Sequence, residues 1–314
     1  MVSTSAFAAP PGAGEMEEEK LEFEEEGEPP EKVARLHLWA DNVFGLGRTR
    51  VLTVQPIRLG GAEAVHHLES VQFSSQNYDV GVSYEFINDL AVGVEFPITH
   101  ITYDTSLGPR GKSAIGNLEL NAEYVRIIAK HLAIVPSLEV ALPTAQGDEP
   151  PTKEEIDAEP GKQRDVAPFD RFAAQRAAAA VRGWEENHLF APHRLGVVPR
   201  IGLLYELGKL EIEPYAKVGM LFSTNSESFE GDIVLALRAG YRIHRLFDAG
   251  ARVWTNIPIG GNLPEDESPV GVVEPQLRGH FGPVLPVFGV VLPFAGPLAH
   301  PENVGIRFAL AAHF

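Results

Sequence analysis

The chain ends in the stretch Val304-Gly305-Ile306-Arg307-Phe308-Ala309-Leu310-Ala311-Ala312-His313-Phe314. Side chains of a β-strand point alternately to its two faces, so every second residue shares a face. One face of this stretch is apolar throughout and finishes on Phe314, whereas the other face carries Arg307, His313 and small residues. The stretch therefore predicts a strand with one apolar and one polar side.

This ladder resembles the closing strand of a bacterial outer-membrane β-barrel, where a terminal aromatic residue belongs to the assembly signal. The resemblance implies that Phe314 has this role. It also implies a location in the bacterial outer membrane, with outer-membrane lipid and the barrel-assembly machinery as partners. Arg307 is then expected to face the lumen.

Composition agrees with such a barrel and excludes two other classes. Mean hydropathy is −0.05, and no apolar run approaches the roughly 18–20 residues that a transmembrane helix needs. In a transmembrane barrel, lipid-facing and lumen-facing residues alternate, so the average stays near zero. The net charge of −17 argues against nucleic acid as a partner, because phosphate is bound by lysine and arginine.

The first 32 residues are expected to lie outside the barrel. Residues 6–8 have the small-x-small form of a signal-peptidase site, so residues 1–9 are interpreted as the remnant of an export signal; a chance alanine-rich start explains the match equally well. Residues 15–32 hold ten glutamates and two lysines, about half of the net charge. We expect 10–32 to be a disordered, acidic periplasmic segment.

Period-two ladders recur along the remaining chain and predict an all-β fold, a transmembrane antiparallel up-and-down barrel over residues 33–314. About twelve strands are counted, an even number as in bacterial single-chain barrels. The strand count is least certain between residues 41 and 76, where residues 49–55 or 68–73 could add a further pair of strands. The expected strands are residues 33–40, 78–86, 90–98, 117–124, 132–142, 195–205, 210–222, 233–243, 247–255, 273–281, 284–294 and 304–314.

The connections alternate in length, which is typical of short periplasmic turns and long outer loops. Short ones are expected at 87–89, 126–131, 207–209, 244–245 and 282–283, and longer ones at 104–115, 144–192, 223–228, 256–268 and 295–302. Four prolines inside strands, Pro136, Pro199, Pro214 and Pro275, lie on the predicted outward face. Because proline cannot donate to the ladder, bulges or kinks are expected there.

The outer loop 144–192 is far longer than an ordinary connection. Residues 168–183 are rich in alanine, begin with Pro168 and end with Gly183, which predicts a short helix. Three placements stay open for it: a cap on the barrel mouth, a constriction inside the lumen, and an exposed helix without a role.

The polar faces of the ladders predict a charged lumen. Acidic and basic walls would face each other there, leaving a water-filled path with a transverse field, an interior bridged by ion pairs, or an ordinary wet lumen without selectivity; partial bridging is favoured for a barrel of this width. The predicted acidic residues are Glu85, Glu95, Glu119, Glu123 and Glu139, and the predicted basic residues are Arg194, Arg200, Lys217, Arg238, Arg242, Arg252, Arg278 and Arg307.

No catalytic residue, metal ligand or cofactor is predicted, because the histidines are scattered and no HExxH pattern or cysteine spacing is present. The stretches Gly116-Asn117-Leu118 and Leu142-Pro143-Thr144 resemble, with their strands, an outer-membrane family of transporters of the meta-pathway of phenol degradation. There the corresponding stretches read Gly-Asp-Leu and Leu-Pro-Thr-Gly. The resemblance implies a barrel that passes small molecules, including hydrophobic or aromatic ones.

Three functions are therefore weighed. The first is a passive channel or transporter for a small-molecule solute, gated at its mouth by the loop 144–192. The second is a structural barrel with a closed lumen. The third, a lipid-modifying barrel enzyme, lacks a nucleophile constellation, so the chain is expected not to be an enzyme.

Overall fold

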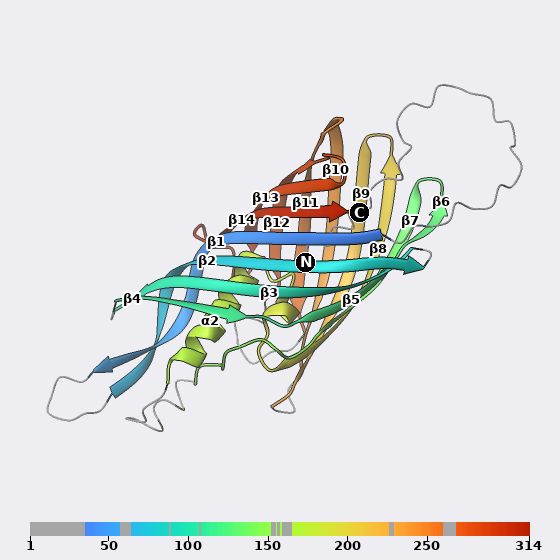
Figure 1. Cartoon of the computed structure of the whole chain (residues 1–314). Helices are drawn as coiled ribbons and strands as arrows, with labels where there is room; N and C mark the ends of the chain where they lie inside the picture. The colour runs from blue at the N-terminus through green and yellow to red at the C-terminus, as the bar shows by residue number, and fades with distance from the viewer. Residues whose placement is uncertain are drawn as a thin grey trace, which may run out of the picture.

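The computed structural model describes residues 35–56, 64–87, 89–106, 108–151, 155, 158, 165–225, 229–259 and 268–314; the predicted export-signal remnant and acidic segment lie outside them. The strands form one antiparallel sheet that closes on itself. Closure arises because β1 (Arg35–Pro56) pairs both with β2 (Ala64–Ile87) and with the last strand, β14 (Val304–His313). The predicted fold, a closed antiparallel barrel, is confirmed (Figure 1).

Twelve strands build the barrel, as predicted, but one of them is broken into three segments. β4 (Gly108–Ile115) and β5 (Glu119–Tyr124) both pair with β3 (Leu90–Thr105), while β5 and β6 (Arg126–Ala129) both pair with β7 (Leu132–Ala141). The other strands pair in chain order: β8 (Arg194–Leu207), β9 (Leu210–Ser223), β10 (Phe229–His244), β11 (Phe247–Pro258), β12 (Val270–Gly279) and β13 (Val284–Ala295).

The two ends of the barrel differ. Tight connections join β2 to β3, β8 to β9, β10 to β11 and β12 to β13 at the end where β1 begins and β14 finishes. We call this the turn end; Leu36 and Phe314 exchange two backbone hydrogen bonds there, of 3.0 and 2.9 Å. The strands β7 and β8, which the long connection 142–193 joins, meet it at the opposite end, which we call the loop end. The expected separation of short and long connections is present, except that β3 and β4 are joined by a short connection at the loop end.

Three strands extend further than predicted. Residues 49–55 and 68–73 continue β1 and β2 instead of adding a pair of strands. The expected long loop 104–115 is wrong, because only two residues separate the end of β3 at Thr105 from the start of β4 at Gly108. A transmembrane strand needs about 9–11 residues, so the long β1–β2 hairpin projects past the loop end (Figure 1). Such extensions need no lipid-facing apolar ladder, which explains why the sequence pattern did not indicate them.

Apolar side chains cover the outside of the barrel. In β14, Ile306, Phe308 and Leu310 are exposed, whereas Arg307 and Ala309 are buried. A continuous apolar surface of this kind indicates contact with another apolar phase. The alternation predicted for the closing strand is therefore present.

The strand prolines cause less distortion than expected. Pro199, Pro214 and Pro275 are exposed on the outward face, and Pro136 is half-buried. The β8–β9 register is the same on both sides of Pro199, with Val197 opposite Met220 and Arg200 opposite Lys217. The bulges predicted at the prolines are thus wrong for the described strands. Register shifts occur instead between Glu85 and Ile87, Ile127 and Ala129, Arg242 and His244, and Gly271 and Val272.

Candidate functional site: the plugged lumen

The insertion between β7 and β8 forms a helix where the sequence predicts one. α2 (Ala167–Val181) is rich in alanine, the strongest helix former, and has Pro168 in its first turn. It ends before Gly183, whose φ of +67° is readily adopted by glycine alone. A 3₁₀ helix, η1 (Asn187–Phe190), follows. Within the described part of the chain, no helix combines the length and apolar character needed to span a membrane.

Both helices lie inside the barrel, and we call residues 165–193 the plug. Ala173, Ala174, Ala177 and Val181 of α2 pack with buried apolar side chains on the loop-end halves of β1 to β4. Small residues permit this close approach: a side chain at Gly45 in the wall would overlap Val181. Of the three placements left open by the sequence, the helix therefore takes the one within the lumen.

Near the loop end, polar side chains hold the first turns of α2. Asp170 accepts a hydrogen bond from the Tyr103 hydroxyl, 2.7 Å away, and forms an ion pair of 2.5 Å with Arg110. One helical turn further, the Gln175 amide donates to the carbonyl oxygen of Ile115 at 2.6 Å. The start of the helix is thus attached to β3 and β4.

At the other end of α2, Arg182 lies in a cluster of buried carboxylates. Its guanidinium contacts Asp41 at 2.9 Å, Asp79 at 2.5 Å and Glu186 at 2.9 Å, and the side chains are at most 3% exposed. Arg307 approaches the same Asp41 at 3.0 Å. Arg182 thus joins the plug to β1 and β2 through charges that water does not reach.

Glu185 joins the plug to the opposite wall. It forms an ion pair of 2.8 Å with Arg252 of β11 and accepts a hydrogen bond from the Tyr215 hydroxyl of β9. Arg252 is held in turn by Glu274 of β12, at 2.7 Å. A buried charged network therefore crosses the lumen from one wall to the other through the plug.

Asn117, in the break between β4 and β5, fixes η1 through the backbone. Its side-chain amide donates to the carbonyl oxygens of His188 at 2.7 Å and Ala191 at 2.9 Å, and its oxygen accepts from Ala145 N–H at 2.8 Å. Its own backbone N–H donates to Leu189 at 2.7 Å. This is the asparagine of the Gly-Asn-Leu stretch, which reads Gly-Asp-Leu in the family that the stretch resembles; an amide, unlike a carboxylate, donates to carbonyl oxygens.

The five predicted acidic residues lie on the inner side of β2, β3, β5 and β7. Glu95, Glu119 and Glu139 are completely buried. The side chain of Glu123 is 25% exposed, and Glu85 lies near the turn end, 3.9 Å from His37. The structure brings Glu119 and Glu139 together around His188 of the plug and leaves Glu85 apart from them.

The predicted basic residues are mostly bridged within their own half of the barrel. Two of them also reach the early strands: Arg200 lies 3.8 Å from Glu123, and Arg307 lies 3.0 Å from Asp41 of β1. Lys217, on the inner face of β9, is also buried. The pairs are Arg194 with Glu230, Arg200 with Glu213, Arg238 with Glu211 and Glu213, Arg242 with Asp248, Arg252 with Glu274, Arg278 with Glu211, and Arg307 with Asp41. Interleaved carboxylates therefore replace the expected pair of walls with opposite charge.

Sequence reasoning missed several members of this network. Asp79 stands on the polar side of a recognised ladder, and Glu274 precedes the outward-facing Pro275, so strand alternation alone could have indicated both. Asp41 was missed because the predicted first strand ended at residue 40, whereas β1 continues to Pro56. Arg182, Glu185 and Glu186 follow the alanine-rich helix directly, and their role became visible only with the helix inside the lumen.

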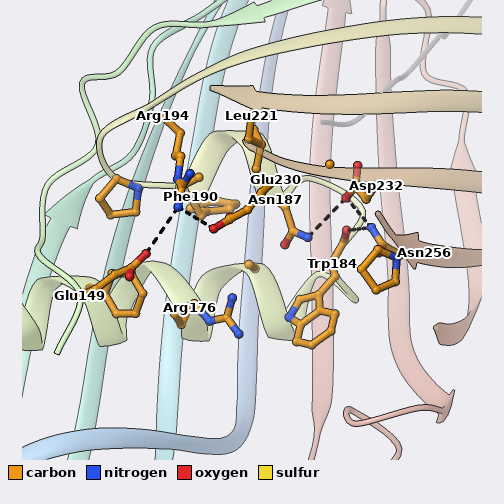
Figure 2. A pocket seen from close by; sticks show the side chains of 16 residues that line it. Glu149, Arg176, Trp184, Asn187, Phe190, Arg194, Leu221, Glu230, Asp232 and Asn256 are labelled. Carbon is orange, nitrogen blue, oxygen red and sulfur yellow. Dashed lines mark hydrogen bonds and ion pairs between the residues drawn. The ribbon is translucent and has the colours of Figure 1, made fainter. Parts of the chain in front are cut away.

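Hollows lie on both sides of the buried charged network around Arg182 and Glu185, one toward the loop end and one toward the turn end. The one at the loop end has a volume of about 90 Å³ and is lined by Phe172, Trp184 and Phe190 of the plug and by Arg194 and Asp232 of the wall, among others. Figure 2 shows Asn256 bridging Asp232 and the Trp184 carbonyl, at 2.6 and 2.7 Å. A smaller hollow of about 20 Å³ lies toward the turn end, beside Glu211, Arg238 and Arg278.

Comparison with solved structures supports the architecture. The chain is similar to an outer-membrane channel from Pseudomonas putida F1, with a TM-score of 0.55 and 11% identity over 92% of this chain and 100% of that one. The KdgM porin in complex with disordered oligogalacturonate gives a TM-score of 0.45 at 8% identity, over 88% and 99% of the two chains. A Pseudomonas aeruginosa FadL homologue gives 0.41 at 8% identity, over 89% and 90%.

No family model matches the chain, and no curated protein matches it. At 11% identity, the likeness to the Pseudomonas putida channel shows a shared fold, a barrel of the outer-membrane type. The finer resemblance to transporters of the meta-pathway of phenol degradation stays a prediction.

Proposed function

We propose that the chain is a bacterial outer-membrane channel for the passive passage of small molecules, with the plug as its gate. The observation that carries this proposal is the position of the plug between the two hollows. The plug is an insertion between two adjacent strands, since Ala141 of β7 pairs directly with Gly196 of β8. It can therefore move without breaking the strand pairing that closes the barrel.

Small amphipathic molecules, aromatic ones among them, are the proposed solutes. Three aromatic side chains and Leu221 line the loop-end hollow, next to Arg194, Glu230 and Asp232. Its volume exceeds the roughly 10–15 Å³ that one water molecule needs. The solute class agrees with what the family resemblance implies. The proposal includes no catalytic step and no energy coupling.

A structural barrel with a permanently closed lumen is the second candidate. The buried contacts of Arg182 with Asp41, Asp79 and Glu186 favour it, because displacing the plug would separate Arg182 from Asp41 and Asp79 at once, two charge-assisted contacts with the wall. The two candidates share the fold and differ in whether the plug ever leaves its place.

Liposome swelling separates them. The full chain and a variant with residues 144–192 replaced by a short glycine–serine linker are reconstituted and exposed to arabinose, to a disaccharide and to 4-hydroxybenzoate. We expect slow swelling with the full chain, fast swelling with the variant for the two smaller solutes, and a preference of the full chain for the aromatic one. If neither protein permits swelling while both migrate as folded barrels, the channel proposal fails.

A further inference from the structure

Three buried side chains from different elements meet where the plug touches the acidic side of the lumen. Glu119 comes from β5, Glu139 from β7 and His188 from η1. The His188 Nε2 atom lies 2.9 Å from Glu119 Oε2 and 3.4 Å from Glu139 Oε2. One nitrogen and two oxygens thus gather within 4.8 Å of one another in a space closed to water.

The carboxyl groups in and beside this cluster lack hydrogen bonds that buried carboxyl groups normally accept. Among the described residues, Glu119 Oε1 and Glu139 Oε2 accept no hydrogen bond. Glu95 stands directly opposite Glu119 in the β3–β5 ladder, is 0% exposed, and neither of its oxygens has a hydrogen-bond partner in the described structure. Burying a carboxylate without a hydrogen-bond partner costs free energy. Because Glu95 is a third such group beside Glu119 and Glu139, the arrangement points to a ligand that the three carboxyl groups would share.

The position of His188 is set by its surroundings and not by the loop alone. Asn117 binds its carbonyl oxygen, as described above. On the other side, a Cβ atom added at Gly196 would lie 3.0 Å from His188 Cβ, so the wall packs closely against the histidine. The imidazole is therefore held against the two carboxylates before anything binds.

We propose that Glu119, Glu139 and His188 bind a divalent first-row transition-metal ion, of which Zn²⁺ is the type, and that this ion fastens the plug to the barrel wall. Ligand atoms around a tetrahedral zinc lie roughly 3.3 Å apart, given bonds of about 2.0–2.1 Å, which the observed spacing approaches. Imidazole combined with carboxylates suits zinc and its neighbours better than Ca²⁺ or Mg²⁺. Glu95, opposite Glu119 in the ladder, would orient a water bound to the ion.

Charge balance supports a divalent ion in particular. Lys217 is buried on β9 and interacts electrostatically with both Glu119 and His188. Arg200 interacts electrostatically with Glu139 and Arg182 with Glu95, but a divalent ion would place two positive charges directly between the oxygens of Glu119 and Glu139. The proposal stands whether or not a solute passes through the lumen, because it concerns only how the plug is attached.

The test is direct titration of the full chain, refolded in detergent without metal, with Co²⁺ as a spectroscopic probe and Zn²⁺ as a competitor. We expect one Co²⁺ per chain, with visible absorption of a four-coordinate ion that Zn²⁺ abolishes. Glu139→Gln and His188→Gln each remove a ligand and should weaken binding at least tenfold. Asn117→Ala removes the support behind His188 and should weaken it about 10–100-fold. Because the site is closed to water, an added ion could enter it slowly. A second titration therefore has the ion present during refolding.

Two control variants match the ligand variants in residue type but lie outside the cluster. Glu123→Gln changes a glutamate of the same wall outside the cluster, and His280→Gln changes a histidine that pairs with Asp248 at the turn end. Both should bind Co²⁺ like the unaltered chain. Heat-modifiable migration on a gel confirms that each barrel is folded; if His188→Gln does not fold, Glu139→Gln alone decides. Absence of bound metal in both titrations, or equal affinity of folded Glu139→Gln, overturns the proposal.

Discussion

Replacing Arg182 with methionine should release the plug without unfolding the barrel. The guanidinium is 3% exposed and contacts three carboxylates that are themselves at most 2% exposed. Methionine keeps much of the side-chain volume but none of the charge. In the variant, Asp41 retains Arg307 at 3.0 Å, whereas Asp79 and Glu186 lose the cation.

The size of the effect follows from the cost of leaving charge buried. Removing one partner of a buried ion pair costs about 3–5 kcal/mol. Water reaches the carboxylates once the plug moves away, so this cost falls on the plugged state alone. At about 1.4 kcal/mol per tenfold change, the equilibrium shifts toward the open state by roughly two to four orders of magnitude.

Single-channel recording in a planar bilayer measures this shift as the fraction of time spent open, and limited trypsin cleavage after Arg171 or Arg176 reports exposure of the plug. Arg48→Met is the control, because Arg48 forms an exposed rim pair with Glu302, whose pKa its hydrogen bond lowers. Adding Asp79→Asn to Arg182→Met should restore part of the closed state. Identical open fractions and cleavage rates for Arg182→Met and the unaltered chain would refute the reasoning.

Three further predictions concern the plug and the assembly of the barrel. Asn117→Ala leaves the carbonyl oxygens of His188 and Ala191 without the Asn117 donor and should destabilise η1 by about 1–3 kcal/mol. The expected readout is faster amide hydrogen exchange over residues 183–193. Unchanged exchange would show that the plug does not depend on Asn117. Gly45→Ala should push Val181 away and displace α2 at a cost of about 1–3 kcal/mol, measured by trypsin cleavage, and Val181→Ala in the same chain should relieve it. Phe314→Ala removes an exposed side chain and leaves the backbone pairing with Leu36 in place. It should therefore lower the amount of folded protein in the outer membrane of cells without affecting refolding in detergent. Equal amounts of folded protein in cells would remove the assembly role of Phe314.

The sequence predicted the barrel because lipid-facing strands repeat one simple pattern, which the terminal ladder around Phe308 displays fully. It failed where that pattern has no physical reason to exist, as in the projecting parts of β1 and β2 and in β4. The charged residues of the lumen could be assigned to the inner face, but not paired. Pairing depends on register and on the plug, and Arg182 is close to Asp41 and Asp79 only because α2 enters the bore.

The central claim is that the lumen is a route which the plug closes. The most direct test is ion conductance across a planar bilayer for the full chain and for the variant with residues 144–192 replaced by a linker, both verified as folded barrels. Our account predicts brief, rare openings of the full chain and steady conductance of the variant. A variant that conducts no more than the full chain would contradict it, because something other than the plug would then close the barrel.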